Sequence, residues 1–202
     1  MASSDDIELS EQLATACRSG SVEDVQRLMQ LGASPRYAAA LPLRSAAAEG
    51  QAECIQALLV EKFAQQELLE ALRLAARRGR MDCAKLLLIH VDASLNNSWP
   101  LMEAAIAGHL DMVRLLLGYS NLGADGLAAI ILSAENRHEE CLSLLLSAVC
   151  PSSRQLAGAR AEANRRGAPE RIIGMIASFE EERELQKSSR RPAGPKRISR
   201  AL

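Results

Sequence analysis

Aromatic residues are scarce in this sequence: its 202 residues include two Phe, two Tyr and one Trp, which is 2%. The hydrophobic core must therefore be built from Ala, Leu, Ile and Val. Runs of β-branched residues that would favour strands are also few. Apolar residues still make up 48% of the chain, which is enough for a sizeable core of closely packed, alanine-rich helices. These features predict an all-α protein of one domain or two small ones.

Long hydrophobic runs are missing as well. No apolar stretch approaches the ~20 residues that span a bilayer. The first residues, MASSDDIELSEQ, lack the basic and apolar regions of a secretory signal. The five cysteines include no CxxC pair, and their odd number is typical of a reducing compartment. We therefore expect a cytoplasmic protein that does not associate with a membrane.

The sequence does contain a repeat. The order LMEAAIAGHLDMVRLLLGY, residues 101–119, recurs in altered form from Leu13, Leu43, Leu72, Ile130 and Arg160. The turn positions are Gly20, Gly50, Gly79, Gly108, Arg137 and Gly167, separated by 30, 29, 29, 29 and 30 residues. Five such intervals predict six structural units of one kind.

Each unit is predicted to be a pair of helices. In the quoted unit, small residues such as Ala104 and Ala105 on the first helix allow a close approach of neighbouring helices. Gly108 can then adopt the positive φ that ends a helix tightly. The second helix begins with an acidic residue, which favours the helix dipole, and is expected to bury its apolar stripe, Val113, Leu116 and Leu117. One pair cannot bury its apolar faces alone, so the pairs are predicted to stack into a solenoid.

This order resembles the ankyrin repeat, whose pattern runs roughly T-P-L-H-x-A-A-x-x-G-H-x-E-V-V-x-L-L-L-x-x-G-A, over about residues 11–178. The resemblance implies an all-α, helix-pair solenoid of about six repeats. The period is about 29 residues rather than the usual ~33, so the β-hairpin fingers are expected to be trimmed or missing. The segment before Leu72 looks helical, which predicts a helix in place of one finger. The sixth unit, with Arg160 and Pro169, is expected to be a divergent C-terminal cap.

Three segments are predicted: an acidic lead over 1–10, the repeat domain over 11–179, and a flexible, basic tail over 180–202. From Lys187 onward the chain has six basic residues and no acid, while the rest has 18 basic and 25 acidic residues, a net charge of −7. The tail is rich in Ser, Pro, Gly and Arg, a composition typical of disorder. It could serve as a solubilising end, a localisation signal or an arm that seeks acidic surfaces.

Candidate catalytic and metal residues are few. Cys54, Cys83 and Cys141 occupy one position in three repeats, where stacked helices lie ~10 Å apart, too far to share a zinc ion. His109 and His138 occupy the position after the turn, where a capping role is expected, and His90 is expected on the surface. No G-x-S-x-G, Walker-type, dinucleotide-binding or H-E-x-x-H motif is present. We predict no enzyme activity, no metal site and no cofactor.

The resemblance places a recognition surface at the two residues before each turn position and in the adjoining loops. Stacking requires no particular side chain there, so these residues are free to contact a partner. The candidates are Arg18, Ser19, Tyr37, Glu49, Arg77, Arg78, Asn96, Trp99, Ile106, Ala107, Asp125, Glu135, Asn136, Arg165 and Arg166. Tyr37, Arg77, Arg78 and Trp99 are the expected hot spots, although Trp99 could instead pack between repeats.

These observations predict a monomeric, non-catalytic module that binds another protein. Scaffolds of this family serve as adaptors, inhibitors, regulators and bacterial effectors, so the resemblance does not choose among these roles. The alternative is a nucleic-acid-binding protein that uses the arginine pairs and the basic tail. The mixed charge of the predicted surface and the scarcity of aromatics disfavour that alternative.

Overall fold

The computed structural model describes residues 4–93 and 95–189, and this part of the chain folds into helices without strands. The helices form six consecutive pairs, each on either side of a predicted turn position. The pairs are α1 (Ser4–Ser19) and α2 (Val22–Gln30), α3 (Tyr37–Glu49) and α4 (Ala52–Leu58), α5 (Gln65–Arg78) and α6 (Met81–Leu88), α7 (Leu95–Ala107) and α8 (Leu110–Leu117), α9 (Ala124–Glu135) and α10 (Glu139–Val149), and α11 (Ser153–Arg165) and α12 (Glu170–Ser189). The predicted all-α solenoid of helix pairs without hairpin fingers is confirmed.

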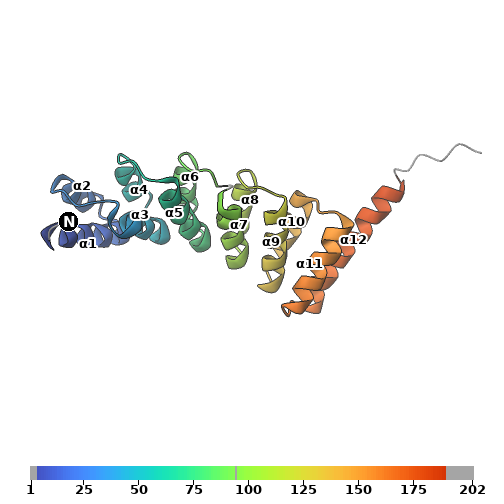
Figure 1. Ribbon diagram of the computed structural model, residues 1–202. Helices are drawn as coiled ribbons and strands as arrows, with labels where there is room; N and C mark the ends of the chain where they lie inside the picture. Colours follow the sequence, from blue (N-terminus) through green and yellow to red (C-terminus); the bar gives the residue numbers. More distant parts are fainter. Residues whose placement is uncertain (1–3, 94, 190–202) are drawn as a thin grey trace, which may run out of the picture.

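The helices lie in two layers along an elongated molecule, with α1 and α12 at opposite ends (Figure 1). The first helix of each pair packs against the first helices of the neighbouring pairs, from α1 on α3 through to α9 on α11. The second layer is built in the same way, with α2 on α4, α4 on α6, α8 on α10 and α10 on α12. Each repeat therefore contacts chiefly the repeats before and after it, as in other solenoids.

The core follows the predicted pattern with one correction. Ala104, Ala105, Val113 and Leu116 are fully buried. Leu117, however, is only partly buried, and Met112 takes its expected place in the core. Met112 and Leu116 are four residues apart and share one face of α8, whereas Leu117 lies at the edge of that face.

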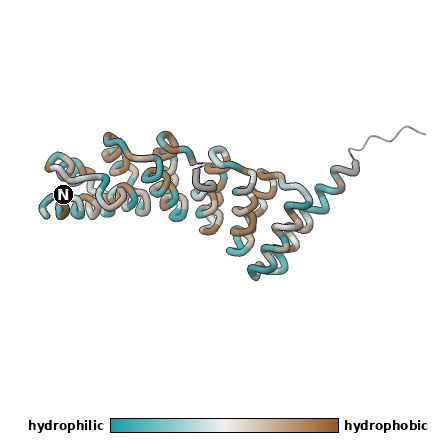
Figure 2. Tube along the Cα trace, viewed as in Figure 1, coloured by the Kyte–Doolittle hydropathy of each residue, from teal (hydrophilic) through white to brown (hydrophobic). Residues whose placement is uncertain are grey.

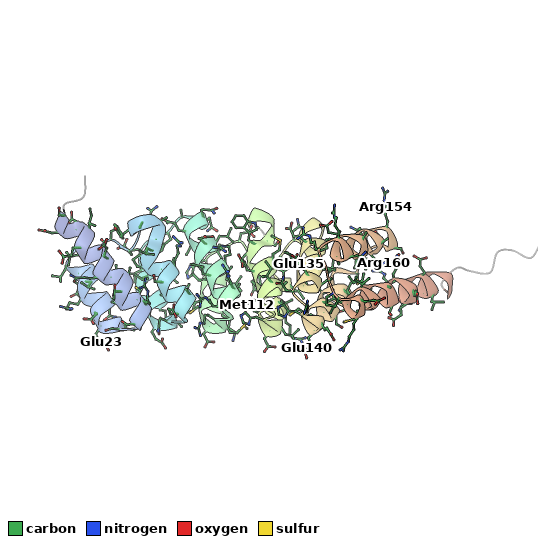
Figure 3. All side chains as sticks on the ribbon, turned by 90° about the horizontal axis from the view of Figure 1, so that it is seen from below. Glu23, Met112, Glu135, Glu140, Arg154 and Arg160 are labelled. Carbon is green, nitrogen blue, oxygen red and sulfur yellow. The ribbon has the colours of Figure 1, made fainter. Side chains whose placement is uncertain are left out.

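Met112, labelled in Figure 3, occupies the same position in its repeat as the cysteines that recur in other repeats. It lies four residues after its turn position, as do Cys54, Cys83 and Cys141, and all four side chains are buried. Burial raises the pKa of the Cys83 thiol to about 11, so this thiol remains neutral at physiological pH. A neutral, buried thiol packs like a small apolar side chain.

Every predicted turn position has a left-handed backbone conformation. The φ angles are 82° at Gly20, 91° at Gly50, 67° at Gly79, 73° at Gly108, 65° at Arg137 and 81° at Gly167. Glycine adopts this conformation without steric cost, whereas a residue with a Cβ is strained there. Arg137 is therefore the one turn position of the six where the backbone is strained.

Replacing Arg137 with glycine is expected to raise the free energy of unfolding by about 1 kcal/mol, because glycine relieves the left-handed strain. Arg137 is exposed, so little packing is lost with its side chain. The urea midpoint measures the gain. Arg137→Ala keeps the Cβ and serves as the control; an equal gain in both variants would show that the arginine side chain, not its backbone, limits stability.

The C-terminal repeat continues further than the sequence suggested. Helix α12 runs to Ser189, whereas the tail was predicted to begin at residue 180. Arg160 Nη1 lies 3.3 Å from Glu180 Oε2, and Arg183 Nη1 donates a hydrogen bond to the Pro151 carbonyl at 2.7 Å. These contacts hold α12 against α11 and against the segment that precedes α11. Residues 1–3 and 190–202, which include most of the basic segment, lie outside the described residues.

The last helix pair is also the more hydrophilic end of the solenoid. Figure 2 shows hydrophobic residues in the helices up to α10, whereas hydrophilic residues are prominent along α11 and α12. A polar outer surface is what a terminal repeat needs, because no further repeat covers it. The described helices include none with the length and hydrophobicity of a membrane span.

Candidate functional site

One face of the first-helix layer stays accessible along the solenoid. We call it the first-helix face and define it by the residues nine, six, five and two positions before each turn, which share one side of a helix. In α5 these residues are Glu70, Arg73, Leu74 and Arg77, and in α7 they are Trp99, Met102, Glu103 and Ile106, none of which is fully buried. Figure 3 labels Glu135 on α9, which belongs to the same face.

A pocket of about 410 Å³ lies in the middle of the first-helix face. Helices α5, α7 and α9 line it with Glu70, Arg73, Trp99, Met102, Glu103, Ile106 and Leu132. Four of these seven side chains are apolar, and they come from α7 and α9. The Trp99 side chain is 42% exposed, so it borders the pocket rather than packing between repeats.

Charged residues of α5 and α7 form the other wall of the pocket. Arg73 donates hydrogen bonds from Nε to Glu70 Oε2 at 2.9 Å and from Nη1 to Glu103 Oε1 at 2.5 Å. The hydrogen bond from Arg73 lowers the pKa of Glu70, so that carboxylate stays ionised. Arg73 thus ties two neighbouring repeats together and fixes this wall.

Two further arginines lie beside that wall with less complete pairing. Arg77 Nε is 3.8 Å from Glu103 Oε2, and the Arg77 side chain is 60% exposed. Arg44, on α3, has a buried Nε atom without a hydrogen-bond partner among the described residues. Arg44 lies six residues before its turn, as Arg73 does in α5, and α3 packs directly on α5. Its charge also helps to lower the pKa of Glu70.

The structure brings together three of the predicted partner-binding residues: Trp99 and Ile106 line the pocket, and Arg77 lies next to it. The other lining residues were not predicted from the sequence; they are Glu70, Arg73, Met102, Glu103 and Leu132. A signal for them was present. They lie three to seven residues before the first of the two candidate residues that precede each turn, on the same side of each first helix.

The candidates at the C-terminal end are joined in an ion-pair network. Arg166 contacts Glu135 at 3.0 Å and Glu162 at 2.7 Å, and Arg165 also pairs with Glu162. The contact between Glu135 and Arg166 connects α9 with α11. Asn136 donates from Nδ2 to the Leu132 carbonyl at 2.8 Å and so helps to end α9.

The remaining candidates divide between internal contacts and open surface. Tyr37 donates from its hydroxyl to Glu11 at 3.2 Å, Asp125 accepts a hydrogen bond from Ser98 at 3.0 Å, and Ser19 bonds to the Ala16 carbonyl. Four side chains are exposed or partly exposed on the surface: Arg18, Glu49, Arg78 and Ala107. Asn96 lies in α7, but its side chain is outside what the structure describes.

A chain of hydrogen bonds between repeats, here called the capping ladder, holds the ends of the first helices. In each case the residue after a turn donates to the carbonyl two positions before the preceding turn. The bonds are Gln51 to Arg18 at 3.4 Å, Arg80 to Ala48 at 3.2 Å, His109 to Arg77 at 3.1 Å, and His138 to Ile106 at 2.9 Å. His109 and His138 therefore act as caps, and the ladder fixes the backbone beneath the candidate residues.

Comparison with known families agrees with this architecture. A family model described as ankyrin repeats (3 copies) matches residues 13–98 and 72–155, which together are more than half of the chain. Most of the sixth repeat lies beyond the matched residues. No curated protein matches the chain.

Proposed function

Because the chain belongs to the ankyrin repeat family, whose repeats are generally protein–protein interaction modules, we propose that it binds a partner protein through the first-helix face. In this role it acts as an adaptor, an inhibitor or a regulator and catalyses no reaction itself. The partner inserts an apolar anchor between α5, α7 and α9.

The central pocket is the observation that carries this proposal. It offers about 410 Å³ beside Trp99, Met102, Ile106 and Leu132, and these side chains are partly open rather than packed against another repeat. Partly exposed apolar and aromatic side chains around a cavity are typical of interface hot spots, because an anchor residue of the partner fills the cavity and excludes water.

The rigidity of the surface supports the same function. Arg73 clamps the charged wall from α5 to α7, and the capping ladder holds the ends of the first helices. A surface that is already ordered loses little conformational entropy when a partner binds. The sequence variation along the face can then determine which partner fits.

Nucleic-acid binding is less well supported by the charges of this face. Arg73, Arg165 and Arg166 each pair with at least one carboxylate. A nucleic-acid surface needs basic groups that are free to contact phosphates along a continuous track. The first-helix face instead alternates charged pairs with an apolar centre.

The proposal predicts that Ile106→Lys lowers partner capture by at least about tenfold, because the new ammonium group must be desolvated when the anchor binds. Tagged chains are used to capture proteins from the native lysate, and quantitative mass spectrometry compares the variants. Ile89→Lys is the matched control: Ile89 also lies at the end of a helix and is 76% exposed, but it belongs to the second layer.

Proteins captured equally by the wild type and Ile89→Lys, but lost with Ile106→Lys, would support the first-helix face as the binding surface. Equal capture by all three chains, with unchanged helicity, would refute it. Loss with Ile89→Lys alone would place the binding surface on the second layer.

A further inference from the structure

The charges beside the central pocket do not balance. On α3, α5 and α7 the pocket wall and its neighbours carry three arginines, Arg44, Arg73 and Arg77, and two carboxylates, Glu70 and Glu103. Arg73 occupies both carboxylates at short distance. Arg77 adds only a longer contact to Glu103, so the group keeps one net positive charge on the side of the pocket that faces the N-terminal repeats.

Arg44 is the most informative of these groups. Its Nε atom is buried and has no hydrogen-bond partner among the described residues. Buried polar atoms are nearly always hydrogen-bonded in folded proteins, and an unpaired one costs free energy. Glu70 is near enough for Arg44 to lower its pKa, yet its carboxylate is held by Arg73. The Arg44 side chain as a whole is partly exposed, and its Nη atoms are not among the buried, unpaired ones, so a carboxylate from outside the chain can bind the outer end of this guanidinium group.

From this arrangement we propose that the partner segment is an acidic peptide with an apolar anchor. The anchor enters the pocket beside Trp99 and Ile106, and an Asp or Glu of the same segment binds Arg44. This inference rests on the proposed function, since it assigns a chemistry to the ligand of that surface. Two N–H groups of an arginine can donate to both oxygens of a carboxylate, which makes the contact directional as well as attractive.

The spacing of the helices sets the spacing of the motif. Adjacent packed helices lie ~10 Å apart, and the pocket is separated from Arg44 by one to two such steps along the row α3, α5, α7. An extended chain advances ~3.3 Å per residue. The acidic residue is therefore expected about three to six positions from the apolar anchor.

The experiment measures fluorescence anisotropy of labelled peptide pools with the full chain. Each peptide has about 15 residues with a leucine at its centre. The three pools differ only at the positions about three to six away from the leucine: these are Asp or Ser in the acidic pool, Lys or Ser in the basic pool, and Ser or Gly in the neutral pool. The wild type is expected to bind the acidic pool at least about tenfold more tightly than the neutral pool, with an affinity that falls as salt is added.

Two variants, Arg44→Gln and Ile106→Lys, locate the contacts, and a third variant, Arg114→Gln, is the control. Arg44→Gln is expected to reduce binding of the acidic pool to the level of the neutral pool, while Arg114→Gln removes the same charge from an exposed site on α8 and should leave it unchanged. Ile106→Lys is expected to weaken binding of every pool. Far-UV circular dichroism confirms that each variant is folded.

The outcomes separate this inference from the proposed function. Equal affinity for the acidic and neutral pools, still lost with Ile106→Lys, would overturn the acidic motif but keep the apolar anchor. Absence of binding to any pool would overturn the acidic motif, and the lysate capture would then decide the proposed function alone. Tighter binding of a labelled oligo(dT) strand than of the acidic pool, lost with Arg44→Gln, would assign the arginines to nucleic acid instead.

Discussion

Gly108→Ala is expected to lower the free energy of unfolding by about 3 kcal/mol, from two separate causes. The backbone at Gly108 has φ 73°, which a residue with a Cβ tolerates poorly. An added Cβ would also lie 2.4 Å from His138 Nδ1, so the imidazole would have to move. Its movement would break the hydrogen bond to the Ile106 carbonyl, a rung of the capping ladder.

Gly167→Ala provides a matched control within the same chain. Gly167 is the turn residue of the last repeat and has φ 81°, but no atom lies within 4 Å of the position of its Cβ. Alanine there carries only the backbone cost, which is about 1 kcal/mol. Urea unfolding followed by circular dichroism measures both variants.

The difference between the two variants, about 2 kcal/mol, is the expected contribution of the ladder contact at His138. Equal losses would mean that the capping ladder adds nothing to stability. A double variant, Gly108→Ala with His138→Ala, checks the cause. Its loss should be smaller than the sum of the single losses, because the clash and the hydrogen bond disappear together.

The repeat made most of the fold predictable from the sequence. A turn position every 29 or 30 residues fixed the six helix pairs, and it located a left-handed residue even at Arg137, where no glycine is present. The ladder was harder to foresee. The four residues have three kinds of side chain: Gln51, Arg80, and the histidines His109 and His138. They form one series only when the stacked repeats bring each of them to the same carbonyl position.

The site was predictable only in part. Helix ends were identified from the family pattern, which gave Ile106 and Arg77. The pocket is built from three first helices, and its wall depends on which carboxylates Arg73 reaches. The carboxylates that pair with Arg73 are determined by side-chain geometry between repeats. The periodicity of residues along one helix therefore does not predict them.

The C-terminal end shows a different limit. Residues 180–186 are rich in charge, a composition that predicts the start of a tail. Glu180 and Arg183 instead contact the preceding helix and the Pro151 carbonyl. Charged side chains that point to fixed partners can prolong a helix whose composition alone resembles a solvated segment.

Ala105→Leu is expected to lower the free energy of unfolding by about 3 kcal/mol, because it forces neighbouring first helices apart. The position three before each turn holds a small, buried residue in five repeats: Cys17, Ala47, Ala76, Ala105 and Ala134. Helix α7 packs on both α5 and α9, so a longer side chain at Ala105 has no direction in which to expand. The change would disturb a contact that the whole first layer repeats.

Ala107→Leu, two residues later on α7, is the control, since Ala107 is partly exposed and leucine can point to solvent. It should change the free energy of unfolding by no more than about 0.5 kcal/mol. Urea midpoints of both variants decide the matter. A small effect at Ala105 would show that the first helices do not depend on close contact. A large effect confined to Ala105 would mean that the buried alanines, rather than the longer apolar residues, set the distance between α5, α7 and α9, the helices that line the pocket.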